Sequence, residues 1–187
     1  MTAPNRPFLC LPEALADGVV LLDSHRLEDA EAHLAGEDEE MRRRFDGAGP
    51  ATLEQTHDAM TRWIEGRAAG GPVFAYAVRR PNGLLIGGCE LRMRSAATVS
   101  ASYWMFPRFR RLGYATRALA LLLDSAAGVA GLDRVEMRIA PDNVASLRLA
   151  RKAGFAEMGE VEEIAPNGAR STMILFTRPL GRPAEEH

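Results

Sequence analysis

Cysteine is scarce in this sequence, and so is lysine. Cys10 and Cys89 are the two cysteines among 187 residues, too few and too far apart for a disulfide framework or a cysteine-ligated metal. A reducing cytoplasm is therefore the simplest setting to infer. Lys152 is the single lysine among 23 basic residues. With abundant alanine, glycine and proline, this bias is typical of a GC-rich genome and indicates no mechanism.

Long apolar runs and an excess of one charge are also missing. No stretch reaches the ~18 uninterrupted apolar residues of a membrane helix, and no basic segment followed by an apolar run opens the chain. We therefore expect neither membrane insertion nor export. The 25 acidic and 23 basic residues give a formal net charge of −2, so no basic field attracts nucleic acid or an anionic membrane. The four histidines lack the spacing of metal ligands, and no metal is expected.

The length suits one domain over residues 1–187, with an irregular lead-in over 1–17 and a frayed tail over 181–187. Short apolar or alternating runs between turn residues predict strands over 18–23, 73–78, 84–91, 99–105, 134–139, 155–162 and 171–177. Helical periodicity and caps predict helices over 27–34, 37–44 and 52–66, then after Gly113 and between Pro141 and Gly154. This order predicts an α/β protein with a mixed sheet.

The stretch 103–116 has the clearest chemical purpose. An aromatic strand stops at Pro107. The chain then becomes basic at Arg110 and Arg111 and continues through Gly113 into a long helix with apolar residues at helical spacing. Proline cannot donate to a sheet ladder, and glycine lets the backbone approach a ligand closely. The first amides of a helix have no intrahelical partner and lie at its positive end, so they can hold phosphate oxygens. The pattern therefore predicts an anion site.

Three motifs carry a resemblance to a known family: Arg110-x-x-Gly113-x-Ala115, Asn143-x-x-Ser146 and Lys152-Ala153-Gly154-Phe155. The first resembles the pyrophosphate-binding motif of the GNAT superfamily of acyl-coenzyme A dependent N-acetyltransferases. The order and spacing of all three are similar to the RimJ and RimL branch of ribosomal-protein N-terminal acetyltransferases. The resemblance implies the GNAT fold, a mixed, mostly antiparallel sheet of six to seven strands flanked by helices. It also implies that the fourth and fifth strands splay apart and hold the thioester between them.

The resemblance further implies acetyl-CoA as cosubstrate. The amides of the turn would hold the pyrophosphate, with a charged hydrogen bond from Arg110 or Arg111. The end of the preceding strand would pair with the pantetheine arm, and one of its amides would be an oxyanion donor. The implied binding set is Trp104, Met105, Phe106, Arg110, Arg111, Leu112, Gly113, Tyr114, Ala115, Thr116, Asn143 and Ser146.

Asn143 and Ser146 lie three residues apart at a helix start, hence on one face. One interpretation is helix capping alone. In the RimL-like pattern, the asparagine instead contacts the pantetheine arm and the serine protonates the departing thiolate. Many GNAT enzymes use a tyrosine on this helix, and its absence here favours Ser146.

The general base has several candidates. The RimL-like pattern supplies a glutamate from the strand after Gly154-Phe155, where Glu160, Glu162 and Glu163 cluster, and Glu163 is slightly favoured. Another acidic position of the family corresponds to Ser100. Glu90 on the preceding strand competes if it faces the cleft. A water relay or the binding of an already neutral amine would also suffice.

The acceptor is expected in a groove built from residues 24–66 and 160–172. Acidic residues there would suit a cationic acceptor: Glu37, Asp38, Glu39, Glu40, Glu162 and Glu163. The resemblance implies the α-amino group of a protein or peptide N-terminus, with antibiotics or polyamines as alternatives. A silent acyl-CoA sensor is a second hypothesis. A dinucleotide oxidoreductase is disfavoured because no glycine-rich turn follows the first strand. Strand edges or the C-terminal hairpin could pair two copies into a homodimer.

Overall fold

The computed structural model describes residues 10–45, 49–164 and 170–181. Within these ranges the strands are β1 (Leu15–Ala16), β2 (Leu21–Asp23), β3 (Val73–Arg79), β4 (Leu85–Met93), β5 (Thr98–Met105), β6 (Arg134–Ile139), β7 (Ala156–Ile164) and β8 (Arg170–Pro179). The helices are α1 (Asp29–Gly36), α2 (Glu39–Phe45), α3 (Leu53–Ala68), α4 (Tyr114–Ala127) and α5 (Val144–Lys152), with a 3₁₀ turn η1 at Pro107–Phe109. None of the helices in these ranges has the length and apolarity needed to cross a membrane.

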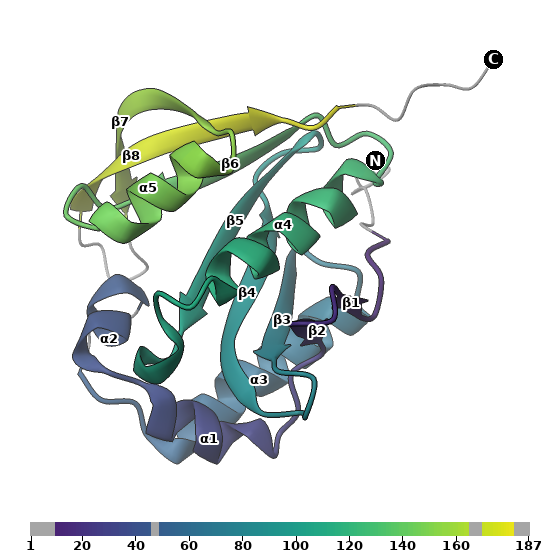
Figure 1. Cartoon of the computed structure of the whole chain (residues 1–187), viewed down its shortest axis with the longest axis vertical. Helices are drawn as coiled ribbons and strands as arrows, with labels where there is room; N and C mark the ends of the chain where they lie inside the picture. The colour runs from purple at the N-terminus through teal and green to yellow at the C-terminus, as the bar shows by residue number, and fades with distance from the viewer. Residues whose placement is uncertain (1–9, 46–48, 165–169, 182–187) are drawn as a thin grey trace, which may run out of the picture.

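All strands form one sheet in the order β1-β2-β3-β4-β5-β6-β8-β7. Only β5 and β6 are parallel, so the sheet is mixed and mostly antiparallel, as predicted. Figure 1 shows α4 crossing in front of β4 and β5 and α5 lying against the β6 to β8 part, while α1 and α3 cover the other face. The main core lies under α4, where Leu119 and Leu122 are almost completely buried.

The predicted splay between the fourth and fifth strands is confirmed, and in the observed numbering it separates β5 from β6. These two strands pair only where Thr98 to Ser100 of β5 meet Arg134 to Glu136 of β6. Beyond this point β5 stays paired with β4 as far as Met105. β6 stays paired with β8 as far as Ile139. Each strand is therefore held by its outer neighbour while the inner edges diverge.

The sheet has eight described strands instead of the six or seven predicted. The additional strand, β1, lies inside the stretch that was expected to be an irregular lead-in. The neighbouring strand begins at Leu21 and not at residue 18, because Asp17 Oδ1 accepts hydrogen bonds from the amides of Val19 and Val20, both at 2.9 Å. These bonds fold the chain into a turn before the strand can start.

The helices follow the predicted pattern with small shifts. The capping box of α3 is present, with Thr52 and Gln55 exchanging side-chain to backbone hydrogen bonds of 2.9 and 3.2 Å. α1 starts two residues later than predicted, because the Asp29 carboxylate accepts from the Arg26 amide at 2.8 Å and organises the turn before it. Residues 165–169, which lie between the last two predicted strands, residues 1–9 of the lead-in and residues 182–187 of the tail lie outside the described residues.

Candidate active site

The turn between β5 and α4 has the form of an anion cradle. Arg111 has a φ of 61° and Gly113, the N-cap of α4, a φ of 84°, so both residues are left-handed. Among the described residues, none of the amides of residues 111–116 donates a hydrogen bond to a protein acceptor. Consecutive unpaired amides at a helix N-terminus provide donors and a positive dipole end. The backbone predicted to hold pyrophosphate therefore fits a polyanion.

The side chain of Arg110 is directed elsewhere. Its guanidinium donates to the two carboxylate oxygens of Asp38 at 2.6 and 2.8 Å and to Glu40 at 3.1 Å. Its Nε donates to the Met105 carbonyl at 3.0 Å. Arg111 is exposed and forms no ion pair with the residues that the structure describes. Of the two predicted phosphate cations, Arg110 thus holds the start of α2 in place.

The three residues expected along the pantetheine arm do not share one orientation. The Phe106 amide donates to the Ile86 carbonyl at 3.0 Å, so it points toward β4. Because peptide groups alternate in direction along an antiparallel strand, those of Met105 point into the splay and those of Trp104 toward β4. Met105 is therefore the member of this set whose backbone faces the gap.

Asn143 and Ser146 occupy the first turn of α5, as predicted. Asn143 is the N-cap, and its Oδ1 accepts from the Ser146 amide at 3.2 Å, which confirms the capping interpretation for the asparagine. The serine hydroxyl has a different partner. Tyr103 Oη donates to Ser146 Oγ at 2.9 Å, joining β5 to α5 across the splay. The Tyr103 side chain was not predicted to belong to the site, because only alternation along β5 indicates its direction and no local pattern identifies its partner.

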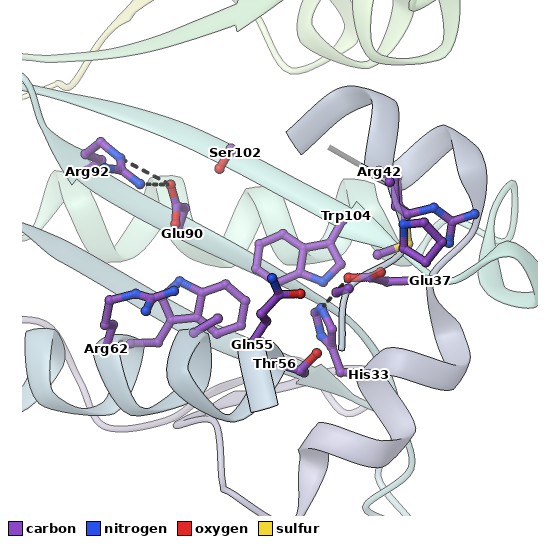
Figure 2. Close-up of a pocket in the computed structure, with 16 residues that line it drawn as sticks. His33, Glu37, Arg42, Gln55, Thr56, Arg62, Glu90, Arg92, Ser102 and Trp104 are labelled. Atoms are coloured by element: carbon purple, nitrogen blue, oxygen red, sulfur yellow. Dashed lines mark hydrogen bonds and ion pairs between the residues drawn. The ribbon is translucent and has the colours of Figure 1, made fainter. Parts of the chain in front are cut away.

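A groove of about 580 Å³ lies on the sheet face that α1 and α3 cover (Figure 2). Its size falls within the ~300–1,000 Å³ of typical ligand sites. Trp63 of α3 and Trp104 of β5 form one wall, with ring centroids 5.4 Å apart and planes 28° apart. Trp104 can lie over β4 because its partner there is Gly88, where a Cβ atom would lie 2.1 Å from the indole ring.

The two favoured base candidates are separated by the fold. Glu90 on β4 lines the groove opposite Ser102, and its side chain is 14% exposed. Arg92 donates to its Oε1 from Nη2 at 3.2 Å and from Nε at 3.4 Å, as Figure 2 shows. Glu163 lies on the edge strand β7, where it pairs with Ser171 of β8. It is not among the described residues that line the groove. Proximity therefore favours Glu90.

Most of the acidic residues that were expected to suit a cationic acceptor do not line the groove. Asp38 and Glu40 pair with Arg110, and Glu162 pairs with Arg170. Among the acids predicted to suit a cationic acceptor, the described groove lining contains only Glu37. It also contains three arginines: Arg42, Arg62 and Arg92. Charge of both signs therefore faces the groove.

A buried ionic network fixes α1, which forms one side of this groove. Arg79 is 2% exposed, and its guanidinium donates to Asp29 at 2.8 and 2.6 Å and to Asp23 at 2.7 Å. Burial acts to raise the pKa of Asp29, but the hydrogen bonds from Arg79 and the Arg26 amide outweigh it and lower that pKa below its usual value. Asp29 therefore remains ionised beneath the site.

His25 packs beside this network, with its ring centroid 4.6 Å from that of Trp63. Burial, followed by the charges of His33 and Arg79, lowers the pKa of His25 to about 3. Its imidazole is consequently neutral at physiological pH and acts as part of the aromatic wall.

An anion cradle, a splayed strand pair and a groove on the opposite sheet face give the chain room for a phosphate-bearing carrier beside a second substrate. The family model of the GNAT acetyltransferase domain matches residues 20–156. The chain belongs to this family and is an acetyl-CoA-dependent acetyltransferase.

Solved structures share the fold over most of the chain. RimL, a ribosomal L7/L12 alpha-N-protein acetyltransferase in complex with coenzyme A, is 16% identical with a TM-score of 0.76, covering 90% of this chain and 98% of that one. Mycobacterium smegmatis RimJ in complex with CoA-disulfide is 19% identical with a TM-score of 0.72, covering 90% and 86%. The microcin C7 self-immunity acetyltransferase MccE, in complex with acetyl-CoA and AMP, is 15% identical with a TM-score of 0.75, covering 87% and 93%. A search of curated proteins found no match.

Proposed function

We propose that this enzyme acetylates the α-amino group of a peptide or protein N-terminus, in the reducing cytoplasm that its two free cysteines suggest. The observation that carries the proposal is the mixed charge of the groove. Figure 2 shows Arg62 of α3 and Arg92 of β4 on one side and Arg42 of α2 on the other. The RimL structure, titled an alpha-N-protein acetyltransferase, is consistent with this acceptor class.

The arginines disfavour the polycationic alternatives. Within the described part of the chain, neither Arg42 nor Arg62 forms an ion pair, so no salt bridge neutralises these two charges at the groove. Like charges brought together in a partly desolvated groove repel. A polyamine or aminoglycoside carries several positive charges, whereas a peptide N-terminus carries one, followed by a backbone that neutral or acidic side chains can accompany.

The basicity of the acceptor supports the same choice. An α-amino group has an ordinary pKa of about 7.7–8.0, whereas a lysine ammonium has one of about 10.4. A large share of α-amino groups is therefore already neutral near pH 7.5, and attack requires only a modest base. Glu90, which lines the groove but is ion-paired with Arg92, suits this limited task.

The proposed reaction proceeds by direct attack in a ternary complex. The amides of residues 111–116 and the Arg111 side chain bind the pyrophosphate of acetyl-CoA, and the neutral amine attacks the thioester carbonyl. The nitrogen–carbon bond forms as the carbon–sulfur bond breaks. Glu90 takes the surplus proton from nitrogen, directly or through water, and then releases it to solvent. Ser146 gives its hydroxyl proton to the thiolate and regains a proton that derives ultimately from solvent, so no alkoxide remains. The products are the amide and free coenzyme A.

A thiol-release assay with calorimetry tests the proposal. The panel contains free N-terminal peptides with neutral, acidic or lysine-containing sequences, the same peptides blocked at the N-terminus, a polyamine and an aminoglycoside. We expect turnover on the free neutral or acidic peptides and none on the blocked ones. Turnover confined to the polyamine or the aminoglycoside would refute the acceptor class. Acetyl-CoA binding without turnover on any amine would instead indicate the sensor function.

A further inference from the structure

The splay is bridged by one hydrogen bond between two hydroxyl groups. Tyr103 lies on β5 beyond Ser100, the last residue of that strand to pair with β6. Its side chain leaves the groove face, which Ser102 and Trp104 occupy, and packs with the main core on the α4 and α5 side. There its phenol donates to Ser146 Oγ at 2.9 Å. The contact joins the two halves of the sheet where they have separated.

We propose that Tyr103 is a positioning residue that orients Ser146 and relays a proton through it to the departing thiolate. This inference rests on the proposed role of Ser146 in acetyl transfer. Ser146 is the one residue of α5, Val144–Lys152, that carries a hydroxyl group. The phenol beside it comes from β5, as the side chain of Tyr103.

The hydrogen-bond capacity of serine supports an orienting role. A serine hydroxyl has one proton and two acceptor lone pairs. Because one lone pair of Ser146 accepts from Tyr103, the serine proton is directed away from the phenol and remains available to another acceptor. The main chain of Ser146 is fixed as well, since its amide donates to Asn143 Oδ1 at 3.2 Å. Backbone and side chain are therefore both held before any substrate binds.

The relative acidities of the groups support the relay. An alkyl hydroxyl is a much weaker acid than a phenol, so Ser146 could not hold the negative charge left after protonating sulfur. In the proposed step the thiolate takes the Ser146 proton as Ser146 takes the Tyr103 proton. This forms one S–H bond, restores the serine O–H and leaves a phenolate. The phenolate regains a proton from water, and the proton lost by the attacking amine returns to solvent through Glu90, so the cycle is balanced.

The environment of Tyr103 keeps it ready to donate. Burial raises the pKa of Tyr103 and outweighs the lowering effect of its hydrogen bond to Ser146. The resting phenol is therefore protonated at neutral pH. Burial also disfavours the charge of the phenolate that the relay leaves, so the equilibrium favours its reprotonation.

Steady-state kinetics on three substitutions test the proposal. We expect Tyr103→Phe to lower kcat by about 5- to 50-fold with little change in the KM for acetyl-CoA. Ser146→Ala should lower kcat by about 100-fold or more, and the double variant should resemble Ser146→Ala because the two groups act as a unit. Tyr76→Phe is the matched control. This substitution removes a buried phenol on β3, whose hydroxyl donates to the Pro12 carbonyl at 2.8 Å. It should leave kcat unchanged.

The outcomes separate the two proposals. Full activity of Ser146→Ala would refute the proposed role of the serine. A large loss in Ser146→Ala with full activity in Tyr103→Phe would leave that role intact and overturn the inference about Tyr103. An equal loss in Tyr76→Phe and Tyr103→Phe would also overturn it, because buried phenols would then matter only for stability.

A second measurement applies even if Tyr103→Phe folds poorly. Site-specific incorporation of 3,5-difluorotyrosine at position 103 preserves the ring and hydroxyl but lowers the phenol pKa. We expect nearly normal kcat at neutral pH and a new loss of kcat as pH rises, because the phenolate has no proton to donate. A kcat profile identical to that of the unmodified enzyme up to the alkaline limit of its stability would contradict the relay.

Discussion

Arg110 and Asp38, 72 residues apart in the sequence, form a two-pronged ion pair of 2.6 and 2.8 Å. The pair joins the turn between β5 and α4, which we propose binds acetyl-CoA, to the start of α2. At the other end of α2, Arg43 and Arg44 both donate to Asp142, which precedes α5. Figure 1 shows α2 between α1 and the β7–β8 hairpin, beside the open end of the splay. The short helix is thus held from both sides of the gap.

Loss of the Arg110 side chain should act through α2. Arg110→Ala and Asp38→Ala are expected to raise the acceptor KM by similar amounts, up to about fivefold, since a surface pair contributes up to ~1 kcal/mol. The double variant should be no worse than either single one. Steady-state kinetics measure the acceptor KM of each variant and calorimetric titration measures its acetyl-CoA affinity, with Arg108→Ala as the exposed control. A much larger loss of acetyl-CoA affinity in Arg110→Ala than in Asp38→Ala would mean that Arg110 binds phosphate.

Gly113 should be required for acetyl-CoA binding more than for folding. No atom lies within 4 Å of an added Cβ there, but the φ of 84° makes any side chain strained, by about 1–2 kcal/mol. We expect Gly113→Val to displace the amide cradle and raise the acetyl-CoA Kd at least about tenfold, equivalent to 1.4 kcal/mol.

Gly131→Val is the matched control for Gly113→Val, because Gly131 has a φ of 87° and equally open surroundings but lies beyond the other end of α4. Thermal unfolding should show similar destabilisation of both variants. Calorimetry should show weak acetyl-CoA binding in Gly113→Val but not in Gly131→Val. Unimpaired binding by a folded Gly113→Val would move the pyrophosphate site elsewhere.

Glu90 should matter for catalysis and Glu163 should not. Glu90→Gln retains the shape of the side chain and is expected to lower kcat/KM by about 10²-fold at neutral pH, the lower end for a general base, because a large share of the amine is already neutral. Part of that loss should be recovered at higher pH, where more of the amine is neutral. Glu163→Gln should be within about twofold of the unmodified enzyme. The reverse ranking of the two variants would assign the base to β7.

Reversing the charge of Arg62 should change acceptor selectivity. With Arg62→Glu, the activity ratio of a lysine-containing peptide to an acidic peptide should rise about fivefold, since one exposed contact contributes up to about 1 kcal/mol. Arg80→Glu makes the same charge change in the β3–β4 turn, outside the groove, and should leave the ratio unchanged. Competition assays with the paired peptides measure this ratio directly. Equal ratios in both variants would exclude Arg62 from acceptor recognition.

The buried His25 should make stability fall in mild acid. Its pKa of about 3 in the folded protein lies below the ordinary 6.5, so the unfolded chain binds more protons between these values. Stability from this group is complete above pH 6.5 and falls by up to about 1.4 kcal/mol per pH unit below it. Denaturant unfolding between pH 7.5 and 5 should show this slope, and His25→Phe, which preserves an aromatic ring, should reduce it. An unchanged slope in His25→Phe would assign the effect to another group.

The elements and the turn between β5 and α4 were predictable because their signals are local. Alternation, helical periodicity and the Thr52 to Gln55 capping box depend on residues a few positions apart. The turn at 110–116 was recognisable for the same reason, since a basic strand end, Gly113 and a helix start are contiguous. The strand β1 was missed because two residues carry no detectable period and are stabilised by their neighbour in the sheet.

The order of helices and strands, and the conformation of the turn where the anion site is predicted, follow from the amino-acid sequence alone. Which distant side chains meet depends on the tertiary structure. Sheet order and register bring Glu90 into the groove and leave Glu163 on an edge strand, and they direct Arg110 to Asp38 and Tyr103 to Ser146. The physical reason is that local propensity sets the conformation of a segment, whereas contacts between segments depend on how the whole sheet is packed.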